Sequence, residues 1–176
     1  MNQWTPRSPF GVQIGEGFEG SGVSAAHVNT VLGDREGPIG AAWAQALASP
    51  TQGHAPFMVV ARPGLAVKPF TLFVNKSALA SKQHANLTWG AAQAGVAAGV
   101  LDAVAGGVIP QEVAELAVLI ASVWVDPGAA TIHQDAIFSN NRVATNTALV
   151  QGSTGRPTAY EVLEDDGGFW NPFYEP

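Results

Sequence analysis

The segment Ala26-His27-Val28-Asn29 places two polar side chains in an otherwise apolar, β-branched stretch. Alternate side chains of a β-strand share a face, so His27 and Asn29 are predicted to point into one space. Histidine gains and loses a proton near neutral pH, and an amide both donates and accepts hydrogen bonds. The pair therefore predicts a proton-transfer site, although a histidine in an apolar strand is also often a structural side chain with satisfied hydrogen bonds.

Two more polar residues extend this candidate site. Lys76 directly follows the apolar run 70–75, where a lysine is ordinarily solvated but can also place an ammonium beside a ligand. Gln93 falls on one side of a predicted helix among apolar neighbours. A buried amide needs hydrogen-bond partners, so we expect Gln93 to meet an incoming ligand or a facing subunit.

Composition excludes several classes of function. The chain has 176 residues, which fits one ordinary domain, and its net charge of -6 leaves no basic stripe for nucleic acid or a membrane surface. It has no cysteine, and its histidines lack the spacing of metal ligands, so we predict no metal site. The first residues lack a signal-peptide pattern, which favours the cytoplasm.

The pattern of elements predicts an α/β (α+β) domain of two layers, because strands and helices are mixed without strict alternation. Predicted strands cover 12–18, 25–32, 57–61, 70–75 and 116–125, and predicted helices cover 38–49, a short stretch capped by Ser77, 88–105 and 135–150. We expect an N-terminal arm over 1–12, a domain over 13–152 and a tail over 153–176. The tail carries large aromatic side chains that we expect to dock on the same or a neighbouring subunit: Phe169, Trp170, Phe173 and Tyr174.

Several spaced motifs occur together in a fixed order between about residues 13 and 150. They are Ala26-His27-Val28, Lys68-Pro69 with Thr71-Leu72 and Asn75-Lys76, Gly90-Ala91-Ala92-Gln93-Ala94-Gly95-Val96-Ala97, Asp102-Ala103-Val104-Ala105, and Gly107-Val108-Ile109-Pro110. With these motifs the chain resembles the formaldehyde-activating enzymes, which condense formaldehyde with the carrier tetrahydromethanopterin.

The resemblance implies a two-layer sandwich like domain 2 of ribosomal protein S5, with a left-handed βαβ crossover, an exception to the usual handedness. It also implies a ring homopentamer with active sites between subunits. By the same resemblance, tetrahydromethanopterin is the co-substrate and His27 is the proton donor. The implied contacts to the carrier are Asn29, Met58, Lys76, Ala78 and Gln93.

Two positions depart from the family pattern: Asn29 replaces an aspartate and Ala78 replaces a threonine. A carboxylate accepts hydrogen bonds through both oxygens, whereas an amide offers one oxygen and a donating nitrogen. The chain is therefore expected to be a divergent paralogue. It is either a formaldehyde-condensing enzyme, a non-catalytic protein that binds a pterin or senses an aldehyde, or an oligomeric scaffold.

Overall fold

The computed structural model describes residues 11–165 and residue 171. The strands are β1 (Gln13–Glu19), β2 (Ala26–Asp34), β3 (Phe57–Met58), β4 (Val60–Arg62), β5 (Leu65–Ala66), β6 (Phe70–Asn75) and β7 (Ala117–Trp124). The helices are α1 (Pro38–Ala48), α2 (Lys82–Leu87), α3 (Gln93–Ala105), α4 (Gln111–Leu116), α5 (Gln134–Thr154) and α6 (Ala159–Glu164). A π-helical turn, Thr88–Ala92, joins α2 to α3 without a break.

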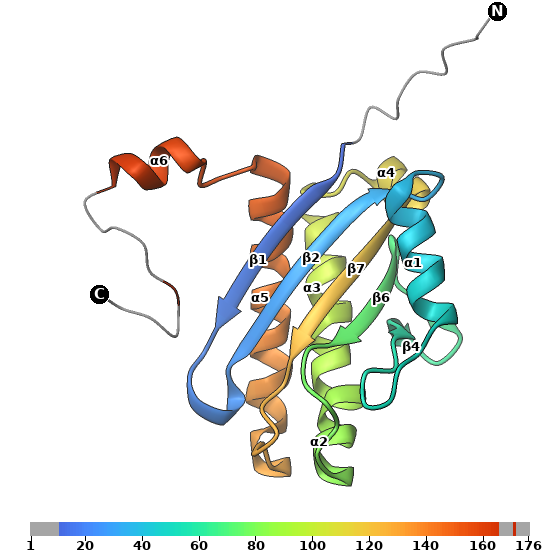
Figure 1. The fold of residues 1–176 in the computed structure, drawn as a ribbon, viewed down its shortest axis with the longest axis vertical. Helices are drawn as coiled ribbons and strands as arrows, with labels where there is room; N and C mark the ends of the chain where they lie inside the picture. Colours follow the sequence, from blue (N-terminus) through green and yellow to red (C-terminus); the bar gives the residue numbers. More distant parts are fainter. Residues whose placement is uncertain (1–10, 166–170, 172–176) are drawn as a thin grey trace, which may run out of the picture.

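A mixed five-stranded sheet with the order β1-β2-β7-β6-β3 forms the centre of the fold (Figure 1). Neighbouring strands are antiparallel except for β6 and β7, which run parallel and are connected through α2, α3 and α4. Both strands of this parallel pair are rich in apolar and β-branched residues, as is typical of strands buried in a sheet interior. Strands β4 and β5 form a separate two-stranded ribbon.

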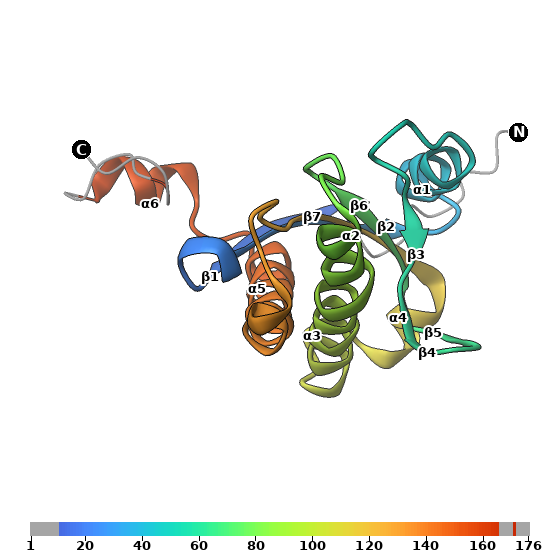
Figure 2. The same cartoon turned by 90° about the horizontal axis from the view of Figure 1, so that it is seen from below.

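Helices α3 and α5 cover one face of the sheet (Figure 2). Helix α5 lies close to both β1 and α3, because glycines occupy the positions where these elements meet. A Cβ atom at Gly17 of β1 would lie 1.9 Å from the carbonyl oxygen of Ala144 in α5. A Cβ atom at Gly95 of α3 would lie 2.4 Å from the carbonyl oxygen of Phe138, also in α5. Small residues therefore let α5 pack against both β1 and α3.

Helix α1 lies on the other side of the sheet (Figure 2). It packs at the end of β2 that is remote from His27, where Ile39 fills the space beside Gly33. The predicted mixed α and β architecture is confirmed, with the difference that α1 partly covers the second face. The rest of that face has no helix of the described chain over it.

Two predicted elements differ in their bounds. The predicted strand over 57–61 is divided between β3 and β4 at the buried residue Val59. The prediction that Ser77 caps a helix is wrong, because its hydroxyl donates to the carbonyl of Val125 at 3.1 Å. The helix begins instead at Lys82, after Ser81, whose side chain accepts from a backbone N–H of the first turn.

The aromatic residues of the predicted tail lie outside the described residues, as does most of the predicted N-terminal arm. None of the helices in the described part of the chain combines the length and apolar character needed to span a bilayer.

Candidate functional site

The side chains of β2 alternate between the two faces of the sheet. Val28 and Thr30 are buried against the helices, whereas His27 and Asn29 are partly exposed on the opposite side. We call this side, which carries His27 and Asn29 and lies opposite α3 and α5, the open face. The structure thus places the two residues on one face, as the alternation in the sequence predicted.

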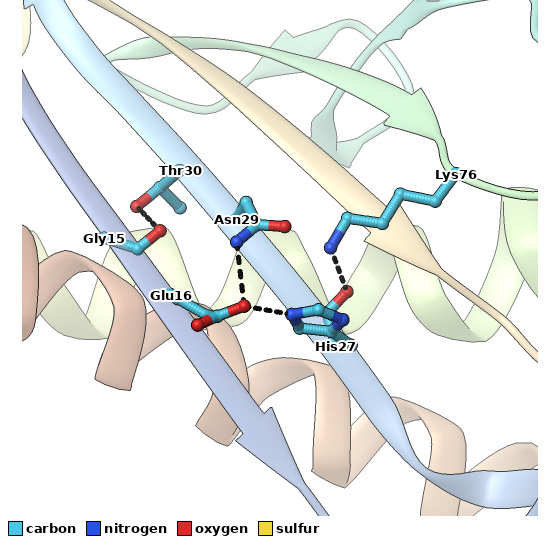
Figure 3. A network of polar contacts seen from close by, with 6 residues as sticks. All are labelled: Gly15, Glu16, His27, Asn29, Thr30 and Lys76. Atoms are coloured by element: carbon cyan, nitrogen blue, oxygen red, sulfur yellow. Dashed lines mark hydrogen bonds and ion pairs between the residues drawn. The ribbon is translucent and has the colours of Figure 1, made fainter. Parts of the chain in front are cut away.

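A third polar residue, Glu16 of β1, joins them on the open face (Figure 3). One carboxylate oxygen, Oε1, lies 2.5 Å from Nε2 of His27 and accepts a hydrogen bond from Nδ2 of Asn29 at 3.2 Å. An ionised carboxylate only accepts hydrogen bonds, so Nε2 carries a proton in this contact. The imidazole is therefore oriented by a fixed acceptor, as a general acid requires.

Glu16 was not recognised from the sequence, where it stands between glycines in 15–20. The antiparallel register of the β1–β2 hairpin pairs Glu16 with Asn29 and Phe18 with His27. Paired residues share a face, so the register alone places Glu16 beside both polar groups. The hydrogen bond from His27 lowers the pKa of Glu16 below its ordinary value, and burial partly opposes this shift. The carboxylate is accordingly charged at neutral pH.

Lys76 reaches this cluster from β6. Its side chain extends across β7, and Nζ donates to the backbone oxygen of His27 at 3.4 Å (Figure 3). The backbone N–H of Lys76 is fixed by the carbonyl of Val123 at 2.8 Å. Burial lowers the pKa of Lys76 to about 8, and the negative charge of Glu16 partly offsets that shift. The open face therefore carries an amine that is more often uncharged than an ordinary lysine.

Apolar side chains surround the polar cluster on the open face. Ile14 of β1 is 70% exposed, and the ring of Phe18 lies 6.1 Å from the ring of His27 between centroids. Ile120 and Trp124 of β7 stand on the same face, because they pair with residues of β2 that point there. An exposed apolar surface with a few convergent polar groups is typical of a ligand or subunit contact.

The other predicted site residues lie apart from this cluster. Met58 is on the same face but in the edge strand β3, where it pairs with Leu72. Ala78 is exposed in the segment after β6, in the neighbourhood of Gly53. The described contacts of one chain thus link Glu16, His27, Asn29 and Lys76, and none of those contacts includes Met58 or Ala78.

Gln93 begins α3, on the helical side of the sheet. It is buried, as predicted, but its Oε1 accepts a hydrogen bond from the backbone N–H of Val60 at 2.8 Å. The expectation that Gln93 meets an incoming ligand or a facing subunit stays a prediction, because this hydrogen bond occupies only its Oε1 atom. A backbone group of the same chain serves as partner, and the amide nitrogen stays available as a donor.

A surface depression lies elsewhere, between α3 and α5. It is lined by Asp102 and Arg142, which form a two-pronged ion pair with distances of 2.6 and 2.9 Å. The two charged groups of this lining are therefore paired with each other. Among the described residues no group of His, Asp and Glu is placed to hold a metal ion.

Comparison with known proteins gives consistent matches along the chain. The family model described as formaldehyde-activating enzyme (Fae) matches residues 14–174. A Methanosarcina barkeri protein named 5,6,7,8-tetrahydromethanopterin hydro-lyase is 39% identical over 160 residues, 91% of this chain and 89% of that protein. An Archaeoglobus fulgidus protein named bifunctional enzyme Fae/Hps is 38% identical over 161 residues, covering 92% of this chain. The match spans 40% of that longer protein.

Proposed function

Because the chain belongs to the formaldehyde-activating enzyme family, we propose that it accelerates the condensation of formaldehyde with tetrahydromethanopterin. The reaction gives the methylene-bridged carrier and water, and its enzyme class is that of the hydro-lyases. The single observation that carries the proposal is the cluster of His27, Glu16 and Asn29 on the open face, in a chain matched by the family over almost its whole length.

The step that most needs catalysis is the loss of water. A secondary amine of the carrier adds to formaldehyde and gives a carbinolamine, whose hydroxyl is a poor leaving group until it is protonated. His27 supplies this proton as a general acid, a role that typically contributes about 10²- to 10⁴-fold. The neighbouring carrier nitrogen then closes on the iminium carbon and forms the bridge. Glu16 holds the imidazole in place through the hydrogen bond with its Nε2 atom.

The residues of the open face fit a reduced pterin, which is a flat heterocycle with several donors and acceptors. The amide oxygen of Asn29 and the ammonium of Lys76 offer an acceptor and donors, and the apolar side chains around them offer a surface for the ring. Both partners held in one pocket react faster than in solution, because the encounter no longer limits the reaction.

We propose that a neighbouring subunit completes this site. Met58, Ala78 and Gln93 lie apart from His27 within one chain, yet all three stand at carrier-contact positions of the family pattern. A ring homopentamer with the left-handed βαβ crossover of the family brings the two sets together. Exposed apolar residues on the open face support such an assembly. We assign the activity to residues 13–152 and place the protein in the cytoplasm.

Complementation tests the shared site. His27→Ala and Gln93→Ala proteins are each expected to be inactive, and unfolding and refolding them as a mixture restores activity if the two residues come from different subunits. Native mass spectrometry measures the number of chains in the assembly. A monodisperse monomer, or a mixture without recovered activity, contradicts the shared site.

The carrier assay tests the function itself. Purified protein is incubated with formaldehyde and either tetrahydromethanopterin or tetrahydrofolate, and formation of the methylene carrier is followed against the spontaneous rate. We expect acceleration with tetrahydromethanopterin. No acceleration with either carrier contradicts the proposed function.

A second candidate function is favoured by Asn29 and Ala78, which replace an aspartate and a threonine of the family pattern. In this alternative the protein binds a reduced pterin or another small ligand, or senses an aldehyde, without turnover. Saturable binding of tetrahydromethanopterin without acceleration identifies this case. The loss of one charged hydrogen bond weakens affinity by about 10- to 150-fold, so the titration must extend to high concentrations.

A further inference from the structure

Lys76 differs from the other lysines of the chain in its surroundings. Lys68 is paired with the carboxylate of Glu115, and Lys82 is exposed at the start of α2. Lys76 is half-buried, and no described carboxylate lies within ion-pair distance of its Nζ. Its amine is therefore held near a proton donor without being neutralised by a direct partner.

The position of the amine is fixed by the sheet. The backbone of Lys76 is bonded to β7, and its side chain crosses that strand to place Nζ 3.4 Å from the carbonyl oxygen of His27 (Figure 3). The imidazole of His27 points from the same residue toward Glu16 on the open face. A primary amine thus contacts the backbone of the residue that carries the general acid. An amine and an acid are the two groups that amine condensation with an aldehyde requires.

On the basis of the function proposed above, we propose that Lys76 takes up formaldehyde covalently and transfers the one-carbon unit to the carrier. This role goes beyond contact with the carrier. It makes Lys76 a nucleophilic catalyst. In this route water leaves from the lysine adduct instead of from a carbinolamine of the carrier, and His27 is the acid for that step.

The steps balance without an oxidant or reductant. The free amine of Lys76 attacks the formaldehyde carbon, and a proton moves from nitrogen to oxygen to give a carbinolamine. His27 protonates the hydroxyl, water leaves, and the nitrogen lone pair forms an iminium. The secondary amine of the carrier adds to that carbon, and its proton passes to the Lys76 nitrogen. The bond from carbon to Lys76 then breaks, which frees the amine and leaves an iminium on the carrier. The neighbouring carrier nitrogen closes the bridge, and its proton returns to His27.

The electrostatics of the open face support this chemistry. With a pKa of about 8, roughly a tenth of Lys76 is free amine at neutral pH, compared with less than about a thousandth for an ordinary lysine. Glu16 is the carboxylate that acts on this amine through its charge. The amide of Asn29 on the same face carries no charge, whereas the aspartate of the family pattern would hold the amine more strongly in its protonated form.

Reductive trapping tests the proposal on the intact wild-type protein. The protein is exposed briefly to isotopically labelled formaldehyde and cyanoborohydride without carrier, and methylation at Lys68, Lys76 and Lys82 is measured by peptide mass spectrometry. We expect Lys76 to be labelled about tenfold or more faster than Lys82, because burial lowers the pKa of Lys76 to about 8. Tetrahydromethanopterin added before the reductant should discharge the adduct and abolish labelling at Lys76 alone.

Substitution provides the second readout. Lys76→Arg keeps the positive charge but cannot form the adduct, so it should retain carrier affinity and lose at least about tenfold in kcat. Lys82→Arg is the matched control and should behave as wild type. Equal labelling of Lys76 and Lys82, or wild-type kcat in Lys76→Arg, overturns the covalent role while leaving the proposed function intact. The proposed function fails separately if the wild-type protein gives no rate above the spontaneous one.

Discussion

The pairing of Glu16 with His27 makes a quantitative prediction about catalysis. Glu16→Gln keeps the shape of the side chain and removes its charge, so the short contact of 2.5 Å loses its charged acceptor. A hydrogen bond to a charged group is worth about 1.5 to 3 kcal/mol, or about 10- to 150-fold in rate. The Glu16 side chain is 62% exposed and that of His27 is 22% exposed, so screening by water places the effect at the lower end. We therefore expect Glu16→Gln to lower kcat by about tenfold.

A double-mutant cycle separates this role from a general effect of charge. His27→Asn should lower kcat by about 10²- to 10⁴-fold, and adding Glu16→Gln to it should cost less than about twofold more, because the carboxylate acts through the imidazole. The assay is the steady-state rate of methylene-carrier formation at saturating substrates. Glu19→Gln, in the same strand but without a described contact to His27, is the control for charge. Equal effects of Glu16→Gln in both backgrounds would refute the assignment.

Three further predictions concern the packing of β1 against α5, the carrier contact of Asn29 and the charge of Glu16. Gly17→Ala forces α5 away from β1, because the new Cβ lies 1.9 Å from a carbonyl oxygen of α5. We expect it to lower the free energy of unfolding by about 1 to 3 kcal/mol or more. Gly11→Ala is the control, because a Cβ at Gly11 meets nothing within 4 Å. Asn29→Asp should tighten binding of the carrier by about 10- to 150-fold in an equilibrium titration. It should also lower kcat at neutral pH, because a second carboxylate raises the pKa of Lys76. Weaker binding of the carrier contradicts the assigned contact. Because the pKa of Glu16 is lowered in the folded state, its contribution to stability is full above its ordinary value of 4.5 and is lost as the pH falls through the folded value. Wild type and Glu16→Gln should therefore converge in Tm on acidification, and a constant difference would contradict the ion pair.

Local patterns in the sequence predicted those strands and turns whose structure depends mainly on residues adjacent in the chain. The strand over Phe70–Asn75 was predicted with its observed bounds, because an apolar run between Pro69 and Lys76 has no competing helical pattern. The hairpin and the alternation of His27 and Asn29 were also predicted, since period-two patterns depend on adjacent residues alone.

The features that the sequence did not predict depend on contacts between residues far apart in the chain. Glu16 was missed because its place beside His27 is set by the register of the hairpin, which the sequence of the turn does not specify. Gln93 was correctly predicted to be buried, but its partner is a backbone N–H of Val60, far away in the chain. Similarly, Ser77 caps no helix, because its hydroxyl donates a hydrogen bond to the carbonyl of Val125.

The most direct test of the central claim is the rate of methylene-tetrahydromethanopterin formation with catalytic amounts of protein, compared between wild type and His27→Ala at equal carrier saturation. We predict that wild type exceeds the spontaneous rate and that His27→Ala loses about 10²-fold or more of that excess. A wild-type rate equal to the spontaneous rate, or an undiminished rate in His27→Ala, would contradict a catalytic imidazole on the open face.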